Sequence, residues 1–399
     1  MPRTLVEHVS SYSEAMLRLT MDLVRIATEN PPGNNYGTAI DLLCSALKSL
    51  GADEIRVEGH CVLGFVGEGE RTLYLSGHYD VVPAQDPSQF QPRVNGKNLF
   101  GRGSSDMKSG LAAMLFAAIA LRDSGGLRNG RIGLVFVPDE ETAGPRGSRY
   151  LAKRGILGQH AIGMLTPEPT GGIVWNANRG AITLNVILKG KSAHVGRQYE
   201  GINAFDNMLK VAGAVSALKL EVEQRVTGFH ISPKAARRSI LLMGGQCSSG
   251  ANFNIVPERC CFTIDRRINP EEDLETEKKR LVAVLEGFKK TSQDLEIEVL
   301  QEGHSSSTAE DHPLGRALAR SIRSVAGKAP RFEMCGGLLE TRFYAEGGIP
   351  AYAYGPGLLS VSHGPKEFVP IDRITECARI YALTAAEMFG KQSRRKITR

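Results

Sequence analysis

The chain has 399 residues, 42% of them hydrophobic and 23% charged, which is the composition of a soluble globular protein long enough for two domains. It contains no apolar run of bilayer-spanning length, and its N-terminal stretch MPRTLVEHVSSYSEAM lacks the apolar core of a secretory signal. We therefore expect no association with membranes.

The formal net charge is +6, but much of it comes from a terminal group that reads as a solvated tail: Lys391, Arg394, Arg395, Lys396 and Arg399. We therefore expect no binding to nucleic acid. Scattered cysteines without paired spacing predict a reduced, cytoplasmic protein.

Apolar periodicity in the first part of the chain predicts alternating strands and helices. Helical spacing runs from residue 11 to 50, with a break at Asn30-Pro31-Pro32-Gly33. Beyond it we expect strands at 54–57, 62–66, 73–75, 131–137 and 161–165, and helices at 110–121 and 148–153. This alternation is typical of an α/β fold with a largely parallel sheet between helices.

The pattern changes after Gly180. We expect a strand at 182–188, a helix at 203–218, strands at 238–243 and 260–266, a helix at 271–290 and a strand at 295–300. This is the order of a ferredoxin-like α+β unit, in which residues 226–237 fit poorly and are interpreted as an insertion. The α/β pattern then returns, with a helix at 314–325, a strand at 351–354 and a helix at 371–388. We therefore predict one domain formed by residues 1–178 and 301–399, and a second domain, residues 179–300, inserted into it.

Acidic and imidazole side chains recur where the predicted strands of the first domain end. They are His78 and Asp80 in SGHYDVVP, Asp106, the pair Glu140 and Glu141, Glu168, and His363 in SHGPKE. Open α/β sheets bind ligands beyond the carboxyl ends of their strands. Each residue alone is more simply read as a solvated polar group, but their joint occurrence favours a site.

So many carboxylates at one place would repel one another without a cation. Two imidazoles and three carboxylates suit zinc, with cobalt and manganese as alternatives. Two divalent ions that share one bridging carboxylate need one histidine and one further carboxylate each. The candidates divide accordingly: Asp106 bridges, His78 and Glu168 complete one site, and Glu141 and His363 complete the other.

Two acidic residues are left for other roles. Glu140, beside Glu141, is a candidate general base that takes a proton from a metal-held water and passes it to a leaving amine. Asp80 lies two residues beyond His78, on the same side of an extended strand, and can orient the imidazole; the alternative is a plain turn residue. The chemistry indicated is metal-assisted hydrolysis of an amide or peptide bond.

A series of motifs resembles the zinc aminoacylase and deacetylase superfamily, which includes acetylornithine deacetylase and succinyl-diaminopimelate desuccinylase. The motifs are GHYDVVPA, GRGSSDMKSG, PDEE, TPEPT, GKSAHVG, NIVPERCCFTIDRR and SHGPKEFV. The resemblance implies a two-zinc catalytic domain with an inserted lid or dimerisation domain, and the ligand and base roles given above. It also implies a cis peptide bond between Asp106 and Met107.

Further roles follow from the resemblance alone. His194 in KSAH is similar to a histidine that enters the partner's active site in a homodimer and stabilises the oxyanion. Asn254 in NIVP, Arg267 in DRR and Arg179 in NRG resemble substrate-binding groups; for Arg267 the alternative is an ion pair within the domain, such as one with Asp265.

One turn departs from the family pattern. Many relatives carry a GGTDAR-like sequence where this chain has GGLLETR, ending at Arg342, which is one residue longer and has leucine in place of a hydroxyl residue. Arg342 is a candidate ligand for a substrate carboxylate. The difference leaves the preferred acyl group and amino acid open.

The function expected is removal of an acetyl or succinyl group from a small N-acyl amino acid by a two-metal, homodimeric enzyme. One alternative is a zinc dipeptidase or carboxypeptidase that uses the same chemistry on a peptide bond. The other is a binding protein that kept the fold but lost catalysis. That reading predicts a broken ligand set or a missing base, and neither is seen in the sequence.

Overall fold

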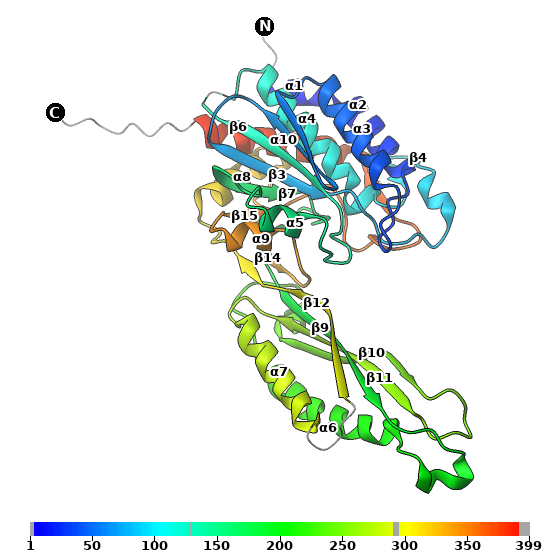
Figure 1. Cartoon of the computed structure of the whole chain (residues 1–399). Helices are drawn as coiled ribbons and strands as arrows, with labels where there is room; N and C mark the ends of the chain where they lie inside the picture. Colours follow the sequence, from blue (N-terminus) through cyan, green and yellow to red (C-terminus); the bar gives the residue numbers. More distant parts are fainter. Residues whose placement is uncertain (1–3, 128, 290–294, 391–399) are drawn as a thin grey trace, which may run out of the picture. The chain divides into compact units, whose positions relative to one another are not determined.

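At the centre of the largest sheet, strands β6, β3, β7 and β15 run parallel, in that order. The computed structural model describes residues 4–127, 129–289 and 295–390, so the predicted basic tail lies outside the described residues. Antiparallel strands flank the parallel core, with β2 and β1 on one side and β8 on the other. The strands are β1 (Glu54–Glu58), β2 (Cys61–Val66), β3 (Thr72–His78), β6 (Arg131–Val137), β7 (Ala161–Thr166), β8 (Val174–Asn178) and β15 (Ala351–Ala353). The predicted parallel sheet is therefore confirmed at its centre (Figure 1).

Alternate residues of each central strand enter two different cores. On β3, Leu73 and Leu75 join one apolar cluster, whereas Tyr74 joins another. Strands β2 and β6 alternate in the same way, because successive side chains of a strand point to opposite faces of the sheet. Both faces are therefore covered by other parts of the chain. The helices are α1 (Leu5–Ser10), α2 (Ser13–Arg25), α3 (Tyr36–Ser49), α4 (Ser109–Asp123), α5 (Ser148–Lys153), α8 (Pro313–Ala326), α9 (Thr341–Glu346) and α10 (Ile371–Gly390).

Helix α4 is the most deeply buried of these elements. Every residue from Ser109 to Leu121 is buried, and the helix packs against α1, α2, α10 and β3. A helix that is apolar on all sides is stable only inside a core. Its N-terminal end is therefore fixed in place, and the Asp106 loop leads directly into it.

The described chain divides into two units. The first comprises Met1–Asn176, Thr308–Phe332 and Phe343–Arg399, and the second comprises Ala177–Ser307 and Glu333–Arg342. The first unit also contains a small antiparallel sheet of β4 (Arg93–Asn95), β5 (Asn98–Phe100) and β16 (Phe368–Pro370).

The second unit has the element order predicted from sequence. Its sheet runs β10-β11-β9-β12 and is antiparallel throughout, which is the strand order of a ferredoxin-like fold. The elements are β9 (Gly180–Lys189), α6 (Ala204–Val222), β10 (Ile240–Ser249), β11 (Arg259–Ile268), α7 (Leu274–Lys289) and β12 (Leu295–Gly303). Two further strands, β13 (Ser306–Ser307) and β14 (Phe332–Cys335), pair with β8 instead. Residues of β9, β10, β11, α6 and α7 share one apolar cluster.

The bounds of the second unit differ from the sequence expectation, which gave it residues 179–300 and placed all of residues 301–399 with the first domain: its main segment is Ala177–Ser307. The segment Glu333–Arg342 belongs to the second unit. The reason is packing, because Met334 shares a small apolar cluster with Ala177 and Ile231, and its amide donates to the carbonyl of His230 at 2.7 Å. So short a segment has no periodic pattern from which this could be predicted.

None of the helices in the described ranges combines the length and apolar character that a bilayer-spanning segment requires.

Two glycines in helices predict opposite effects on stability. At Gly110 in α4, an added Cβ would lie 2.3 Å from the Cβ of Pro167 and 2.9 Å from its carbonyl oxygen, so Gly110→Ala should destabilise by about 1–3 kcal/mol. At Gly213 in α6 an added Cβ meets nothing within 4 Å, so Gly213→Ala should stabilise by roughly 0.5–1 kcal/mol. Urea unfolding midpoints measure both changes, and equal shifts of the same sign would contradict this account of the core.

Candidate metal centre

Three neighbouring parallel strands deliver polar residues to one edge of the sheet. Strand β3 ends at His78, β6 is followed by Glu140 and Glu141, and β7 is followed by Glu168. Because β6, β3 and β7 are adjacent and parallel, their carboxyl ends meet at the same edge. Asp106 comes from the turn before α4, and its peptide bond to Met107 is cis, as the resemblance implies. His363 comes from the loop between β15 and β16.

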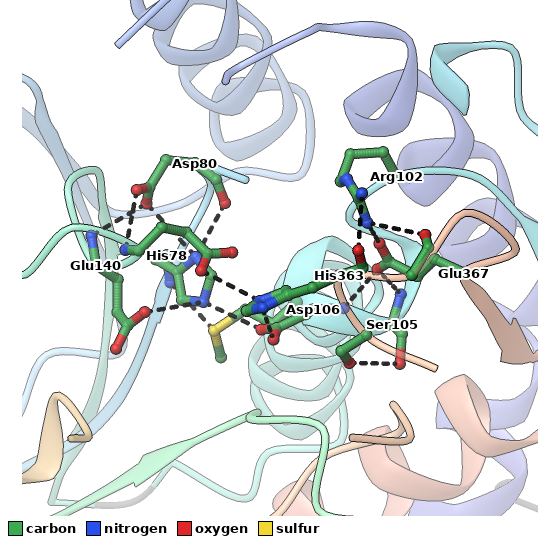
Figure 2. A network of polar contacts seen from close by, with 12 residues as sticks. His78, Asp80, Arg102, Ser105, Asp106, Glu140, His363 and Glu367 are labelled. Atoms are coloured by element: carbon green, nitrogen blue, oxygen red, sulfur yellow. Dashed lines mark hydrogen bonds and ion pairs between the residues drawn. The ribbon is translucent and has the colours of Figure 1, made fainter. Parts of the chain in front are cut away.

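Asp106 lies between the two imidazoles (Figure 2). The Nε2 atom of His78 is 3.3 Å from Asp106 Oδ1, and the Nε2 atom of His363 is 3.3 Å from Asp106 Oδ2. Each oxygen of one carboxylate therefore faces a different histidine. This is the arrangement that a carboxylate bridging two cations requires.

Two groups of three potential ligands share Asp106. One consists of His78, Asp106 and Glu168, and the other of Asp106, Glu141 and His363; within each group the ligand atoms lie within 4.8 Å of one another. Glu141 Oε2 is 3.2 Å from His363 Nε2, whereas its buried Oε1 has no hydrogen-bond partner among the described residues. A buried carboxylate oxygen without a donor is costly, and a cation would satisfy it. The donor set, imidazole nitrogen with carboxylate oxygen, fits zinc.

The electrostatics of the metal-free cluster follow from its crowding. Hydrogen bonds to Asp106 and Glu141 raise the pKa of His363 to about 10. Burial would lower the pKa of His78, but the adjacent Asp106 and Asp80 carboxylates raise it well above its usual value. Burial by itself would raise the pKa of Asp106, yet the two imidazolium groups hold it well below the ordinary range. Without metal, the histidines therefore hold protons that balance the carboxylates.

Asp80 is completely buried and contacts several parts of the site. The Nδ1 atom of His78 lies 3.0 Å from the Asp80 backbone oxygen and 3.4 Å from its carboxylate. The same carboxylate accepts hydrogen bonds from the backbone amides of Glu140 and Glu141, both at 3.3 Å. Asn30 Nδ2 donates to it at 2.9 Å. Asp80 therefore contacts a candidate ligand, His78, and also the loop that carries the candidate base.

Glu140 lies beside the two ligand groups without belonging to either. Its Oε2 atom is 3.9 Å from His78 Nε2, and its side chain keeps 16% exposure, against 1% for His78. A carboxylate that is near the ligand atoms but open to solvent can exchange protons with water.

His363 adopts a conformation that is unusual for its residue type. Its φ angle is 64°, in the left-handed region, which costs a non-glycine residue on the order of 1 kcal/mol. Its carbonyl accepts from Gln85 Nε2 at 3.0 Å and from Arg102 Nη2 at 3.2 Å. Such backbone strain persists only where neighbouring groups hold it.

Sequence reasoning missed three polar residues of this region: Asn30, Arg102 and Glu367. Glu367 and Arg102 form a buried ion pair of 2.5 Å behind Asp106 and His363. Each of the three lies inside a motif that was noted for other reasons, namely a proline break, a glycine-rich turn and SHGPKE. A charged or amide residue within such a motif is the only signal in the sequence that could have identified them.

The remaining candidates all lie in the second unit. His194 is exposed, and its Nδ1 accepts from the Gly196 amide at 3.1 Å. Asn254 is half-buried, and its Oδ1 has no hydrogen-bond partner within the described part of the chain. Asn254 Oδ1 is therefore a polar atom that no described residue satisfies.

The three candidate arginines are held by their own unit. Arg179 is buried and donates to Asn269 at 3.0 Å and to the Arg238 carbonyl at 2.8 Å. Arg267 forms the 2.8 Å ion pair with Asp265 that the sequence left as an alternative. Arg342 is buried and donates to the Leu339 carbonyl at 2.8 Å. Of the three, Arg267 is the most accessible, with its side chain 25% exposed.

Comparisons with known proteins agree with this geometry. The model of Peptidase family M20/M25/M40 matches residues 74–387. Succinyl-diaminopimelate desuccinylase of Paracoccus denitrificans (strain Pd 1222) is 27% identical over 384 residues, covering 91% of this chain and 96% of that protein.

Solved structures share the fold. The M20 family metallo-carboxypeptidase Sso-CP2 from Sulfolobus solfataricus superposes with a TM-score of 0.78 at 18% identity, covering 94% of this chain and 99% of that one. A dinuclear metal binding peptidase of the M20 family from Bacillus subtilis gives a TM-score of 0.66 at 13% identity, covering 96% of this chain and all of that one (100%). With the family model matched over most of its length, this chain belongs to Peptidase family M20/M25/M40 and is a hydrolase of that family.

Proposed function

We propose that the protein is a two-metal amidohydrolase that removes an acetyl or succinyl group from an N-acyl amino acid. The observation that carries the proposal is the position of Asp106, whose two carboxylate oxygens face His78 and His363 separately. A single ion would not need a carboxylate shared in this way. The similarity to a desuccinylase over nearly the whole chain supports the choice of substrate class.

In this proposal His78, Asp106 and Glu168 hold one ion, and Asp106, Glu141 and His363 hold the other. Bound divalent cations supply Lewis acidity, which polarises a carbonyl and makes water a better nucleophile near neutral pH. Zinc is the first candidate, with cobalt and manganese as alternatives. Asp80 orients His78 through Nδ1 and fixes the loop that carries Glu140 through two amide hydrogen bonds.

Glu140 is the proposed general base. Its carboxylate accepts a proton from the attacking water and donates it to the nitrogen of the departing amine, so the amide bond breaks with no net change in the charge of Glu140. His194 of a second copy is proposed to stabilise the oxyanion, and Asn254, Arg179, Arg267 and Arg342 to bind substrate. Among the arginines Arg267 is favoured, because Arg179 and Arg342 are buried against their own unit.

A homodimer formed through the second unit is also proposed. That unit exposes large apolar side chains, with Phe253 97% and Tyr199 79% accessible, and its strand β10 is at an edge of the sheet. Exposed apolar groups and an open edge strand in the same unit favour association with another copy. The reducing, cytoplasmic compartment is proposed from the cysteines, which are scattered along the sequence without paired spacing.

A peptidase acting on dipeptides or on peptide C-termini is the second candidate. It is favoured by the similarity in fold to a metallo-carboxypeptidase, and it requires the same metal chemistry. The difference would lie in the substrate pocket, where the GGLLETR turn departs from the pattern of many relatives.

Glu140→Gln should lower kcat by roughly 10²–10⁴-fold, because it removes the proton acceptor and keeps the shape of the side chain. Metal content, measured by mass spectrometry of the purified protein, should stay at the wild-type value. Exposed Glu346→Gln, in the same unit, is the control and should leave both quantities unchanged. Wild-type kcat in the Glu140 variant would remove this residue from its role.

Metal binding should release protons and become tighter as pH rises. The pKa of His363 is about 10 in the metal-free cluster, so at pH 7 the imidazole must lose a proton before it can bind a cation. The apparent affinity should therefore increase as the pH rises from 7 towards 10. Calorimetric titration with Co²⁺ in buffers of different ionisation enthalpy measures the protons released. His363→Ala should release fewer, and a pH-independent affinity would contradict the proposal.

A panel of N-acetyl amino acids, N-succinyl amino acids and dipeptides distinguishes the two candidate functions. We expect kcat/KM to be highest for one of the acyl amino acids, with activity lost in chelator and restored by Zn²⁺ or Co²⁺. Rapid cleavage of dipeptides alone would favour the peptidase instead.

A further inference from the structure

Glu367 holds the backbone of Asp106, whose carboxylate the two ligand groups share, and of the residue before it. Its Oε1 atom accepts hydrogen bonds from the backbone amides of Ser105 and Asp106, both at 3.0 Å. Its Oε2 atom accepts from Arg102 Nη1 at 2.5 Å. Both side chains of this ion pair are only 1% exposed. One carboxylate thus fixes two successive peptide groups of the turn from which the Asp106 side chain projects (Figure 2).

Arg102 holds the loop of the second histidine. Its Nη2 atom donates to the His363 carbonyl at 3.2 Å and to Gln85 Oε1 at 2.8 Å. Its Nη1 atom lies 3.4 Å from the carbonyl of Gly364. These contacts restrain the peptide that follows His363, a residue whose φ of 64° is unfavourable without such support.

We propose that Arg102 and Glu367 form a positioning pair that fixes Asp106 and His363 relative to each other, and so sets the metal affinity of the ligand groups that contain them. The inference rests on the proposed two-metal function and concerns residues that touch neither metal nor substrate. Glu367 acts on Asp106, which belongs to both ligand groups. Arg102 acts on His363, which belongs to one.

Substitutions of the two residues should therefore affect metal binding differently. Loss of the Arg102 contacts should weaken the group of Asp106, Glu141 and His363 and leave the group of His78, Asp106 and Glu168 unchanged. Loss of the Glu367 contacts should weaken both groups. A buried ion pair that served only the fold would change neither group selectively, because its loss lowers global stability rather than one binding step.

Conservative variants keep the fold while they disturb the pair. Lysine at position 102 retains the charge but cannot donate to Glu367 and to the His363 carbonyl with the two arms of a planar fork. Glutamine at position 367 retains the shape and one acceptor oxygen. The double variant R102M/E367Q removes both buried charges, so it distinguishes lost positioning from the effect of one unpaired charge. Circular dichroism and urea unfolding report the fold of each variant.

The test is titration of the metal-free full-length protein with Co²⁺, followed by calorimetry and by visible absorption of the bound ion. Wild-type protein should bind two ions in two resolvable steps. We expect Arg102→Lys to weaken one step by roughly 10- to 100-fold, and Glu367→Gln and the double variant to weaken both by that amount. The His363→Ala variant identifies the step to which His363 contributes, and this should be the step that Arg102→Lys changes.

Glu277→Gln is the matched control, because Glu277 forms a buried pair with Arg266 at 2.8 Å in the second unit. It should lower stability and leave both Co²⁺ affinities at the wild-type values. If both binding steps are unchanged in folded Arg102→Lys and Glu367→Gln, the proposed role of the pair is wrong, and the proposed metal centre is not affected. A wild-type protein that binds no Co²⁺ would overturn the metal centre itself, and the role of the pair with it.

Discussion

The site depends on one constraint, the crowding of carboxylates around Asp106. Asp106 is buried between two imidazoles, each 3.3 Å from a different oxygen. Burial alone would make so much negative charge untenable. In the metal-free cluster the raised pKa values of His78 and His363 supply the compensating protons. In the proposed enzyme two cations replace these protons, so the arrangement that stores protons without metal is the one that binds metal.

Two loops that carry candidate ligands are held in place in the same way, each by one buried carboxylate. Asp80 accepts hydrogen bonds from the backbone amides of Glu140 and Glu141. Glu367 accepts hydrogen bonds from the backbone amides of Ser105 and Asp106. In each case a buried carboxylate fixes two successive peptide groups of a loop that carries a candidate ligand. Each carboxylate also accepts a hydrogen bond from a side chain, Asp80 from Asn30 and Glu367 from Arg102. The loops are irregular, and their precision comes from these charge-assisted hydrogen bonds.

The parallel sheet determines where the candidate ligands at its strand ends lie. Strands β6, β3 and β7 are adjacent and parallel, so their carboxyl ends lie at one common edge, and their side chains alternate between two apolar cores. Periodicity predicted this well, because burial on two faces leaves a strong pattern: β6 and α5 were expected with the bounds the structure gives them. Strands β8 and β14 were missed. The short β14 is fixed by a contact far away in sequence, the amide of Met334 with His230.

The sequence by itself determined the α/β fold with its inserted ferredoxin-like unit, because hydrophobic spacing and motif order are local properties. It also named His78, Asp106, Glu141, Glu168 and His363 as candidate ligands, since residues at strand ends in such a fold must converge. Only the tertiary structure decided which oxygen of Asp106 faces which histidine, and that Arg102 and Glu367 lie behind them. It also decided that Arg179 and Arg342 are buried against their own unit. Such pairings join residues that are distant along the chain, and no local pattern records them.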